Sequence, residues 1–529
     1  MNRLLASLAP IALLTVTTAA VGATELRAPE LHDLAIENGG RPFAGDGRVL
    51  TTISPNGDGY RDRALIRFRL DRDATVRLAI SQAKPDPRTV YTVVRRLRAG
   101  RHHFTWSPPA ETAARTYFAQ FTLVGAQGRR RTSSAKPAVN GKPSGTIVVR
   151  VRGIDAAFGR ASYRPGDRAT LSIATDAKQL SLQFLRAGKA RISSTELGAE
   201  VGDPVRLAWS GRRDRPHVVT VPIGRWRSGV YFARLTADDG RIGYAPFVLR
   251  PETLGEHRVA VVLPTYTWQA YNLWDENGDG FGETWYAAWS QRTVRLGRPF
   301  LNRGVPPRFR RYDLPFLRWL ELKDQEVDYL SEADLSRTTG NALADAYTLV
   351  VFPGHHEYVP ERMYDAVERY RDRGGNLLFL SANNFFWKVS KQGSRLERTG
   401  LWRNLRRPEA RLLGVQYRGN DQGLRRAPFV VRNAPAGKWV FEGTELATGS
   451  RFGGFGIEID GTAPTSPRGT QVLAEIPNLL GPGQTAQMTY YETPRGAEVF
   501  AAGVMDFTSR ALSTPVDRIL DNLWRRLAA

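Results

Sequence analysis

Short segments in which apolar and polar residues alternate dominate the first half of this 529-residue chain. Residues 64–70 and 229–235 are clear examples. Alternation with a period of two predicts half-buried β-strands, and Gly- and Pro-containing turns separate these segments at regular spacing. We therefore predict two small β-sandwiches, at residues 45–125 and 146–250. The polar residues 126–145 between them, rich in Gly, Ser and Pro, are typical of a linker.

The pattern changes near His257, after which short apolar runs alternate with amphipathic segments. The apolar runs predict buried strands at residues 258–263, 327–330, 347–352, 376–380 and 498–502. The amphipathic segments predict helices at residues 314–323, 360–373 and 515–527. Strands that alternate with helices predict a flavodoxin-like α/β domain at residues 256–529, with a mainly parallel sheet and helices on both faces. After about residue 405 the pattern becomes irregular and rich in β-strand signals.

The first residues are typical of a secretory signal. Arg3 precedes the apolar residues 4–16, and the small residues Val21, Gly22 and Ala23 follow, so we predict a signal peptide at residues 1–23. No other segment is apolar and long enough to predict a transmembrane anchor. The protein is therefore expected to be secreted, either extracellular or in the cell envelope.

Composition excludes several kinds of chemistry. The chain has no cysteine, which excludes thiol nucleophiles and cysteine–zinc sites. The net charge of +23 comes from arginines that are scattered along the chain rather than gathered in one stripe, so we expect no nucleic-acid partner. For an exported protein, cell-wall anions or anionic lipid headgroups are the electrostatic partners to expect, although a solvated surface explains most of this charge.

Chemically versatile side chains follow three of the predicted strands. They lie in residues 267–272, 354–358 and 381–384. Because residues just past strand ends line the ligand crevice of an open α/β sheet, we expect these segments to meet. Glu357 is the natural centre, as a metal ligand or a base, with His355 beside it and Tyr271 adding a phenol. The alternatives are a helix-terminal charge for Glu357, an ordinary loop residue for His355 and a core aromatic for Tyr271.

A polar insertion after the first of these segments resembles the start of an EF-hand-type calcium loop. Asp275, Asn277 and Asp279 stand at alternate positions and Glu283 follows, which suits Ca²⁺ ligation through oxygen atoms. The twelfth position of such a loop is Tyr286 rather than Glu, so a plain polar turn is the alternative. Residues 54–62 (Ser-Pro-Asn-Gly-Asp-Gly-Tyr-Arg-Asp) pose the same choice between a turn and Ca²⁺.

The second half of the chain resembles the C-terminal domain of the N,N-dimethylformamidase large (beta) subunit family. The matching pieces include Thr-Trp-Gln-Ala-Tyr-Asn at 267–272, Arg-Trp-Leu-Glu at 318–321, Gly-His-His-Glu-Tyr at 354–358, Ser-Ala-Asn-Asn at 381–384 and Gly-Ile-Glu-Ile-Asp at 456–460. Residues 54–62 are similar to the opening of Ig-like modules in flagellar hook-capping and secreted surface proteins, so both sandwiches are expected to be Ig-like.

This resemblance implies a fold like that of glutamine amidotransferases, without their catalytic cysteine, and a mononuclear Fe(III) held by two tyrosines and one glutamate. Glu357 matches the family glutamate and Tyr271 matches one tyrosine. His355 matches a histidine that contacts the metal ligands without binding the metal itself. The family often has Arg-Pro-Tyr where this chain has Arg-Pro-Phe, and Phe300 cannot bind a metal. Tyr286 is then the other candidate for the second tyrosine.

Two functional hypotheses follow. The first is a metal-dependent hydrolase of an amide-type C–N bond, acting on a small amide or an envelope-derived substrate, with Asn383 as a polar contact to the substrate. The second is a non-catalytic surface protein whose degenerate amidase-like domain binds an envelope glycan or peptide, with the sandwiches as spacers. The sequence does not decide whether a small partner subunit exists.

Overall fold

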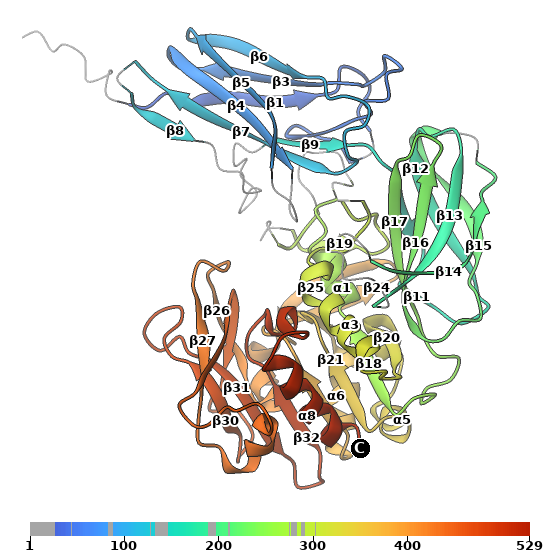
Figure 1. Cartoon of the computed structure of the whole chain (residues 1–529), viewed down its shortest axis with the longest axis vertical. Coiled ribbons are helices and arrows are strands. Elements are labelled where there is room, and N and C mark those ends of the chain that lie inside the picture. The colour runs from blue at the N-terminus through green and yellow to red at the C-terminus, as the bar shows by residue number, and fades with distance from the viewer. Residues whose placement is uncertain are drawn as a thin grey trace, which may run out of the picture.

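The computed structural model describes residues 27–529 except 44, 83–87, 127, 133–146, 189–196, 210–211, 275, 277–282, 287–290 and 302. The predicted signal peptide and most of the predicted linker lie outside the described residues. Two β-sandwiches lead into a larger C-terminal domain, which carries the lower part of the molecule in Figure 1.

The first sandwich consists of two sheets that share one hydrophobic core. One sheet has the order β1 (Leu31–Glu37), β3 (Ala64–Leu70) and β6 (Gly100–Trp106). The other has the order β2 (Leu50–Ile53), β9 (Ile147–Val151), β7 (Thr116–Val124), β4 (Ala74–Gln82) and β5 (Thr89–Leu97), with β8 (Arg130–Thr132) paired to β7. Ile66, Leu78 and Phe121 are fully buried between them. Strand β9 lies beyond the predicted end of this sandwich and completes its sheet.

The second sandwich also has two sheets. The smaller one contains β10 (Asp155–Phe158), β12 (Arg168–Thr175) and β15 (Arg212–Pro222). The larger one has the order β11 (Ser162–Tyr163), β17 (Ile242–Leu249), β16 (Gly229–Ala237), β13 (Leu180–Ala187) and β14 (Gly198–Arg206). The likeness of both sandwiches to Ig-like modules stays a prediction.

The prediction of a flavodoxin-like, mainly parallel C-terminal domain is wrong. Its nine-stranded sheet is mixed, and the parallel half has the order β20 (Asp328–Ser331), β18 (Val259–Leu263), β21 (Leu349–Phe352), β23 (Asn376–Phe379) and β32 (Glu498–Ala501). The antiparallel half continues with β31 (Ala486–Glu492), β30 (Gln471–Ile476), β27 (Arg426–Val431) and β28 (Arg451–Gly456). Antiparallel neighbours need only short connections, so the irregular segment after residue 405 adds strands without crossover helices.

With the smaller elements included, 42% of the described residues lie in strands and 16% in helices. Strands β19 (Thr293–Arg295), β25 (Arg395–Leu401), β24 (Trp387–Gln392) and β22 (Tyr358–Pro360) form a separate four-stranded sheet. Strands β26 (Gln416–Asn420) and β29 (Glu458–Gly461) pair with each other. The chain is therefore β-rich throughout, including the part in which helices and strands were expected to alternate.

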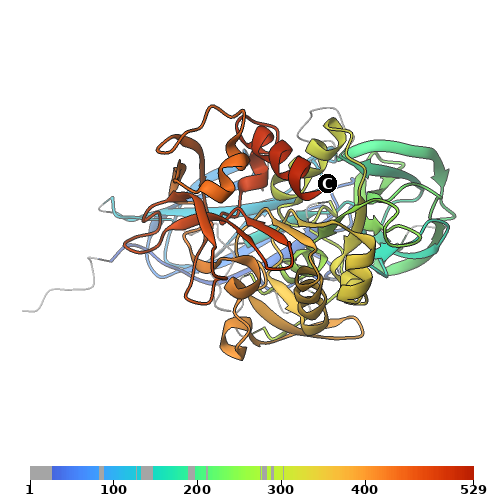
Figure 2. The same cartoon turned by 90° about the horizontal axis from the view of Figure 1, so that it is seen from below.

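Helices cover both faces of the parallel half of the sheet. Alternate residues of β18 enter two separate cores, Val259 and Val261 on one side and Ala260 and Val262 on the other. The first core includes α3 (Leu314–Leu322) and α8 (Val516–Leu527), and the second includes α5 (Gly340–Ala346) and α6 (Glu361–Asp372). Figure 2 shows α8 on the opposite side of the sheet from the helices of the second core. This layering holds the carboxyl ends of the parallel strands in one row.

The second sandwich is fused to the C-terminal domain. Val230 and Phe232 of β16 enter the same core as Phe309 and Leu317, and the rings of Phe232 and Phe309 are 5.3 Å apart. The Arg186 guanidinium pairs with Glu321 of α3 at 2.5 Å. The two parts therefore bury apolar surface jointly.

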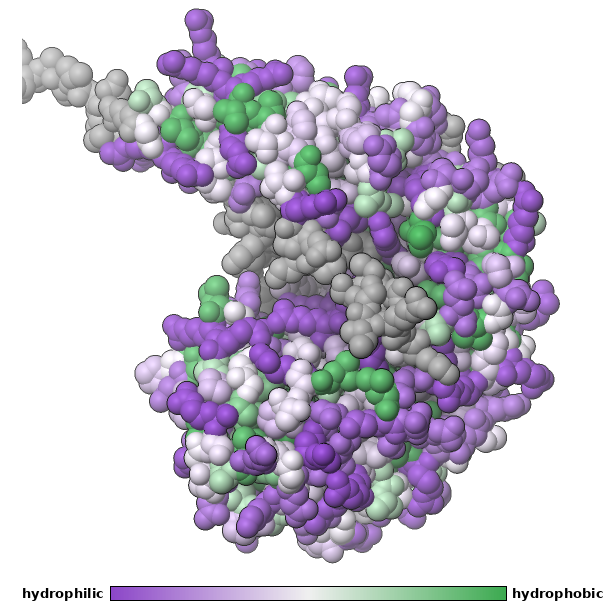
Figure 3. All heavy atoms as spheres, in the orientation of Figure 1, coloured by the Kyte–Doolittle hydropathy of each residue, from purple (hydrophilic) through white to green (hydrophobic). Residues whose placement is uncertain are grey.

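The face drawn in Figure 3 is hydrophilic over most of its area, with small apolar patches scattered on it. This distribution suits a solvated, strongly charged surface. In the described part of the chain, every helix is too short or too polar to cross a membrane.

Candidate active site

Three strand ends meet as predicted from their positions in the sequence. Strand β18 leads into α1 (Thr265–Ala270), which ends at Tyr271. Strand β21 leads into residues 353–357, and β23 leads into residues 380–384. Because β18, β21 and β23 are consecutive parallel neighbours, their carboxyl ends lie at one edge and bring these segments together.

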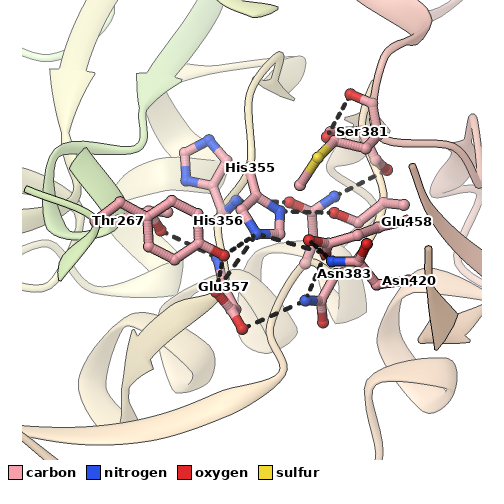
Figure 4. Close-up of polar contacts among 12 residues, drawn as sticks. Thr267, His355, His356, Glu357, Ser381, Asn383, Asn420 and Glu458 are labelled. Carbon is pink, nitrogen blue, oxygen red and sulfur yellow. Dashed lines mark hydrogen bonds and ion pairs between the residues drawn. The ribbon is translucent and has the colours of Figure 1, made fainter. Parts of the chain in front are cut away.

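Tyr271, His355 and Glu357 form the centre of the site. The Tyr271 hydroxyl donates to Glu357 Oε2 at 2.5 Å and lies 3.0 Å from His355 Nε2. His355 Nδ1 lies 2.9 Å from the carbonyl oxygen of Ala382. A carbonyl can only accept, so Nδ1 carries a proton and Nε2 is the nitrogen that faces the cluster. Figure 4 shows His355 and Glu357 turned toward each other.

Asn383 links Glu357 to a second carboxylate, Glu458. Its side-chain nitrogen donates to Glu357 Oε1 at 3.3 Å and to Glu458 Oε2 at 2.8 Å, while its backbone nitrogen donates to Asp460. Asn383 has a φ of 54°, in the left-handed region that Asn tolerates better than most residues. Asn420 donates to the other oxygen of Glu458 at 2.9 Å (Figure 4). Asn383 therefore holds the two carboxylates at a fixed separation.

Glu458 and Asp460 were not predicted as site residues. They lie on β29, within a segment that the resemblance had already matched, and both are almost fully buried. Their alternation with Ile459 looks like an ordinary half-exposed strand, so the sequence gives no signal that both carboxylates are buried. The sequence alone could not place β29 against the loop after β23.

The charges in this cluster are unequal. Burial by itself would raise the pKa of Glu357, but hydrogen bonds from His355, Tyr271 and Tyr358, with the charge on His355, hold it below its ordinary value. Burial would lower the pKa of His355, and the carboxylates of Glu458 and Glu357 raise it instead. Burial raises the pKa of Glu458, opposed by His355 and reinforced by the charge of Glu357. Of the two carboxyl groups, Glu357 is therefore the one whose environment favours the charged form, while burial disfavours charge on Glu458.

Tyr286 and Phe300, the two sequence positions considered for a second tyrosine, lie in different surroundings. The Tyr286 ring packs edge-on to Tyr271 with centroids 5.2 Å apart, and its hydroxyl accepts from Arg308 at 2.9 Å. Phe300 is buried in the hydrophobic core that the second sandwich shares. Sequence reasoning also missed Tyr358, whose buried hydroxyl hydrogen-bonds Glu357. Tyr286 is thus beside Tyr271, whereas Phe300 is part of the packing.

His356 points away from this cluster, as the extended geometry of the loop predicts. Its Nδ1 lies 2.9 Å from Glu332 Oε1, and both side chains are fully buried. Glu332 Oε2 also accepts from the backbone nitrogen of Tyr266 at 2.5 Å, at the start of α1. The pair therefore joins the loop of Glu357 to the helix that ends at Tyr271.

Of the four residues predicted to bind calcium, Asp275, Asn277 and Asp279 lie outside the described residues. Glu283 accepts a hydrogen bond from the backbone nitrogen of Glu276 at 2.6 Å. Within the described part of the chain, His, Asp and Glu side chains form no group of three or more that could hold a metal ion.

The fold and this cluster define a class of protein: a mixed α/β domain with a buried Tyr–His–Glu–Asn site and no cysteine, fused to a β-sandwich. The sequence model of the family described as N,N-dimethylformamidase beta subunit-like, C-terminal, matches residues 208–517, more than half of the chain. The chain belongs to this family. The match begins inside the second sandwich, at the region that shares its core with the C-terminal domain.

One curated relative is the N,N-dimethylformamidase beta subunit of Paracoccus aminophilus, 25% identical over 219 residues. The alignment covers 34% of this chain and 28% of that protein, so this chain spans well under half of its relative. Solved structures with weak likeness include the Escherichia coli alpha-2-macroglobulin, at 13% identity over 43% of this chain and 24% of that one, with a TM-score of 0.23. Red sea bream transglutaminase has 11% identity over 41% and 31%, with a TM-score of 0.21. Likeness at this level carries no functional argument.

Proposed function

We propose that the protein is a metal-dependent hydrolase of an amide-type C–N bond, with a small amide as substrate. The observation that carries this proposal is the buried cluster of Tyr271, His355, Glu357 and Glu458, in a chain of the dimethylformamidase beta subunit-like family. Two carboxylates sit around one imidazole, with Nε2 of His355 at 3.4 Å from Glu357 and 3.7 Å from Glu458. Glu357, whose pKa lies below its ordinary value, would supply the negative charge that a bound metal cation needs.

The donor atoms suit Fe(III), which the family resemblance implies. Tyr271 and Glu357 offer hard oxygen ligands, and the Tyr286 ring stands beside Tyr271 as the candidate for the second phenol. The resemblance implies Tyr271 rather than Tyr358 as a ligand, although the hydroxyl of Tyr358 also hydrogen-bonds Glu357. A ferric ion held here would act as a Lewis acid that activates water and polarises an amide carbonyl.

The other residues of the site would handle protons and orient the substrate. The pKa values of His355 and Glu458 are both raised, which favours their protonated forms, so either could serve as the acid that protonates a leaving amine. Asn383 Oδ1 is buried and has no hydrogen-bond partner among the described residues, so it can accept from a substrate N–H. The Ala382 carbonyl fixes the orientation of the imidazole.

Export and assembly belong to the same proposal. Residues 1–23 read as a signal peptide, so we place the mature enzyme outside the cytoplasm. The relative carries the name of a beta subunit, so we propose that this chain also works with another subunit.

Metal content and the visible spectrum of the mature protein test the proposal. We expect near-stoichiometric iron and a visible charge-transfer band, because a ferric phenolate absorbs visible light. Glu357→Ala and Tyr271→Phe should lose both, Tyr286→Phe should weaken the band, and Tyr358→Phe is the matched control that should retain it.

A colourless, iron-free protein would overturn the iron proposal and favour a surface protein that binds an envelope glycan or peptide. Hydrolysis of a panel of small amides then measures the reaction itself. If the protein contained iron but hydrolysed no amide, the proposed metal site would be supported and the proposed reaction would be contradicted.

A further inference from the structure

A cavity of about 560 Å³ lies between the second sandwich and the C-terminal domain. One wall comes from β10, β11 and β17 of the sandwich, and the other from α1, residues 296–300 and the hairpin at residues 391–394. This volume falls in the range of small-molecule binding sites. Each domain supplies only part of the lining, so the cavity exists because the two are fused.

The cavity lies behind α1, on the side away from the active site. Thr265 and Gln269 are four residues apart, share one face of the helix and line the cavity. Thr267 and Tyr271 share the other face, where Thr267 Oγ1 accepts from the backbone nitrogen of Glu357 at 3.2 Å. The two pairs are offset by two residues, which is a little over half a turn. A molecule in the cavity would thus contact the helix that ends at Tyr271 without entering the active site.

Positive charge exceeds negative charge in the lining. The cationic residues are Arg160, Arg250, Arg298, Arg337 and Lys391, and the acidic one is Asp167. The carboxylate of Asp334, which is not part of the lining, forms ion pairs with two of these arginines, with Arg250 at 3.5 Å and with Arg337 at 2.7 Å.

Two of these cations have no carboxylate within ion-pair distance in the described part of the chain. Lys391 Nζ donates to the carbonyl oxygen of Gly393 at 2.9 Å. The buried Arg298 guanidinium donates to backbone carbonyls, among them Arg295 and Glu283 at 2.8 Å each. The Arg298 guanidinium is thus committed to the protein's own backbone, whereas Lys391 is exposed at the mouth, where it can attract an anionic ligand.

The rest of the lining combines aromatic surface with unsatisfied polar atoms. Phe158, Trp268 and Phe300 supply apolar walls. Thr265 Oγ1 and Gln269 Oε1 are buried, and neither has a hydrogen-bond partner among the described residues. Buried polar atoms are normally satisfied, so such atoms at a cavity wall point to a missing partner. The Thr265 hydroxyl can donate to a carboxylate, whereas Gln269 Oε1 only accepts and would take a donor such as water.

We propose that this cavity binds a small organic carboxylate with an apolar body, at a site separate from the active site. The carboxylate would lie among the arginines and Lys391, and the apolar body would lie against Trp268 and Phe300.

Isothermal titration calorimetry on the full chain tests this with 3-phenylpropionate as the probe. We expect one saturable site per chain, and binding about tenfold or more weaker for 3-phenylpropan-1-ol, which lacks the charge. Inorganic phosphate, which lacks the apolar body, should also bind at least about tenfold more weakly. Equal affinity for acid and alcohol, or for acid and phosphate, would overturn the proposal, as would the absence of saturable binding.

Variants at the exposed rim locate the site without disturbing the core. Lys391→Gln should weaken binding, and Ser394→Trp, which obstructs the mouth, should abolish it. Lys388→Gln is the matched control on the same strand, because Lys388 pairs with Glu361 at 3.0 Å instead of lining the cavity. Glu357→Ala should bind normally. Loss of binding in Glu357→Ala, or an equal loss in both lysine variants, would place the carboxylate elsewhere and refute the assignment.

Discussion

Asp313 shows how a single buried residue can set the pH response of the fold. It is 2% exposed, accepts from Trp268 Nε1 at 3.1 Å, and its other oxygen has no hydrogen-bond partner among the described residues. Burial raises the pKa of Asp313 to about 8. At neutral pH the folded protein therefore keeps a proton that the unfolded chain releases.

Asp313→Asn is expected to flatten the pH dependence of stability. Between about pH 4 and pH 8 the folded state binds one more proton than the unfolded state, so the free energy of unfolding falls as pH rises through this window. Asn cannot ionise, so the free energy of unfolding of the variant should not fall in this way. Relative to the parent, it should be higher at pH 8 than at pH 5 by about 1 kcal/mol or more. Urea unfolding at both pH values measures this. An equal difference between variant and parent at both pH values would contradict the explanation.

Helix α1 illustrates the element scale, because six residues are too few for a stable isolated helix. Pro264 provides no side-chain cap at its start. Instead, Glu332 accepts from the backbone nitrogen of Tyr266 and pairs with His356 in the loop after β21. One carboxyl group thus fixes two of the segments that build the active site.

Glu332→Ala should lower the free energy of unfolding by about 2 to 4 kcal/mol. The substitution leaves His356 Nδ1 and the backbone nitrogen of Tyr266 buried without a partner, and each such group costs about 1 to 3 kcal/mol. Glu361→Ala is the control, since that exposed residue forms a surface ion pair with Lys388 and its loss should cost less than about 1 kcal/mol. Chemical denaturation compares the two. Similar losses would show that Glu332 has no special structural role.

At the scale of the whole molecule, the second sandwich and the C-terminal domain share one hydrophobic core, so we expect them to unfold together. Phe232 lies in the sandwich and packs on Phe309 of α2 (Phe309–Tyr312) in the C-terminal domain. The core of the first sandwich, which contains Phe68, is separate. The family match, which starts at residue 208, includes β16 and Phe232 but leaves out the first strands of the second sandwich.

Two matched Phe→Ala substitutions should separate these units. Phe232→Ala is expected to cost about 3 to 5 kcal/mol and to lower the unfolding temperature of the C-terminal domain with that of the second sandwich. Phe68→Ala should cost a similar amount but destabilise only the first sandwich. Differential scanning calorimetry resolves the transitions. If Phe68→Ala shifted every transition equally, the first core would not be independent.

Part of the active site could be predicted from the sequence. Glu357, His355, Tyr271 and Asn383 could be proposed from the sequence because each follows an apolar strand, and parallel strands deliver their carboxyl ends to one edge. Glu458 and Tyr358 could not be proposed in the same way. Their place depends on β29 and β22, whose neighbours are far away in the sequence.

The sequence by itself determined the local elements of this protein. Alternation marked β3 at residues 64–70 and a continuous apolar run marked β18 at residues 259–263, because burial on one face or two leaves a local pattern. Only the tertiary structure decided which strands pair. The same apolar residues suit parallel and antiparallel neighbours, so the antiparallel half of the sheet, the fusion of the second sandwich and the cavity at that junction all arise from contacts that no local pattern specifies.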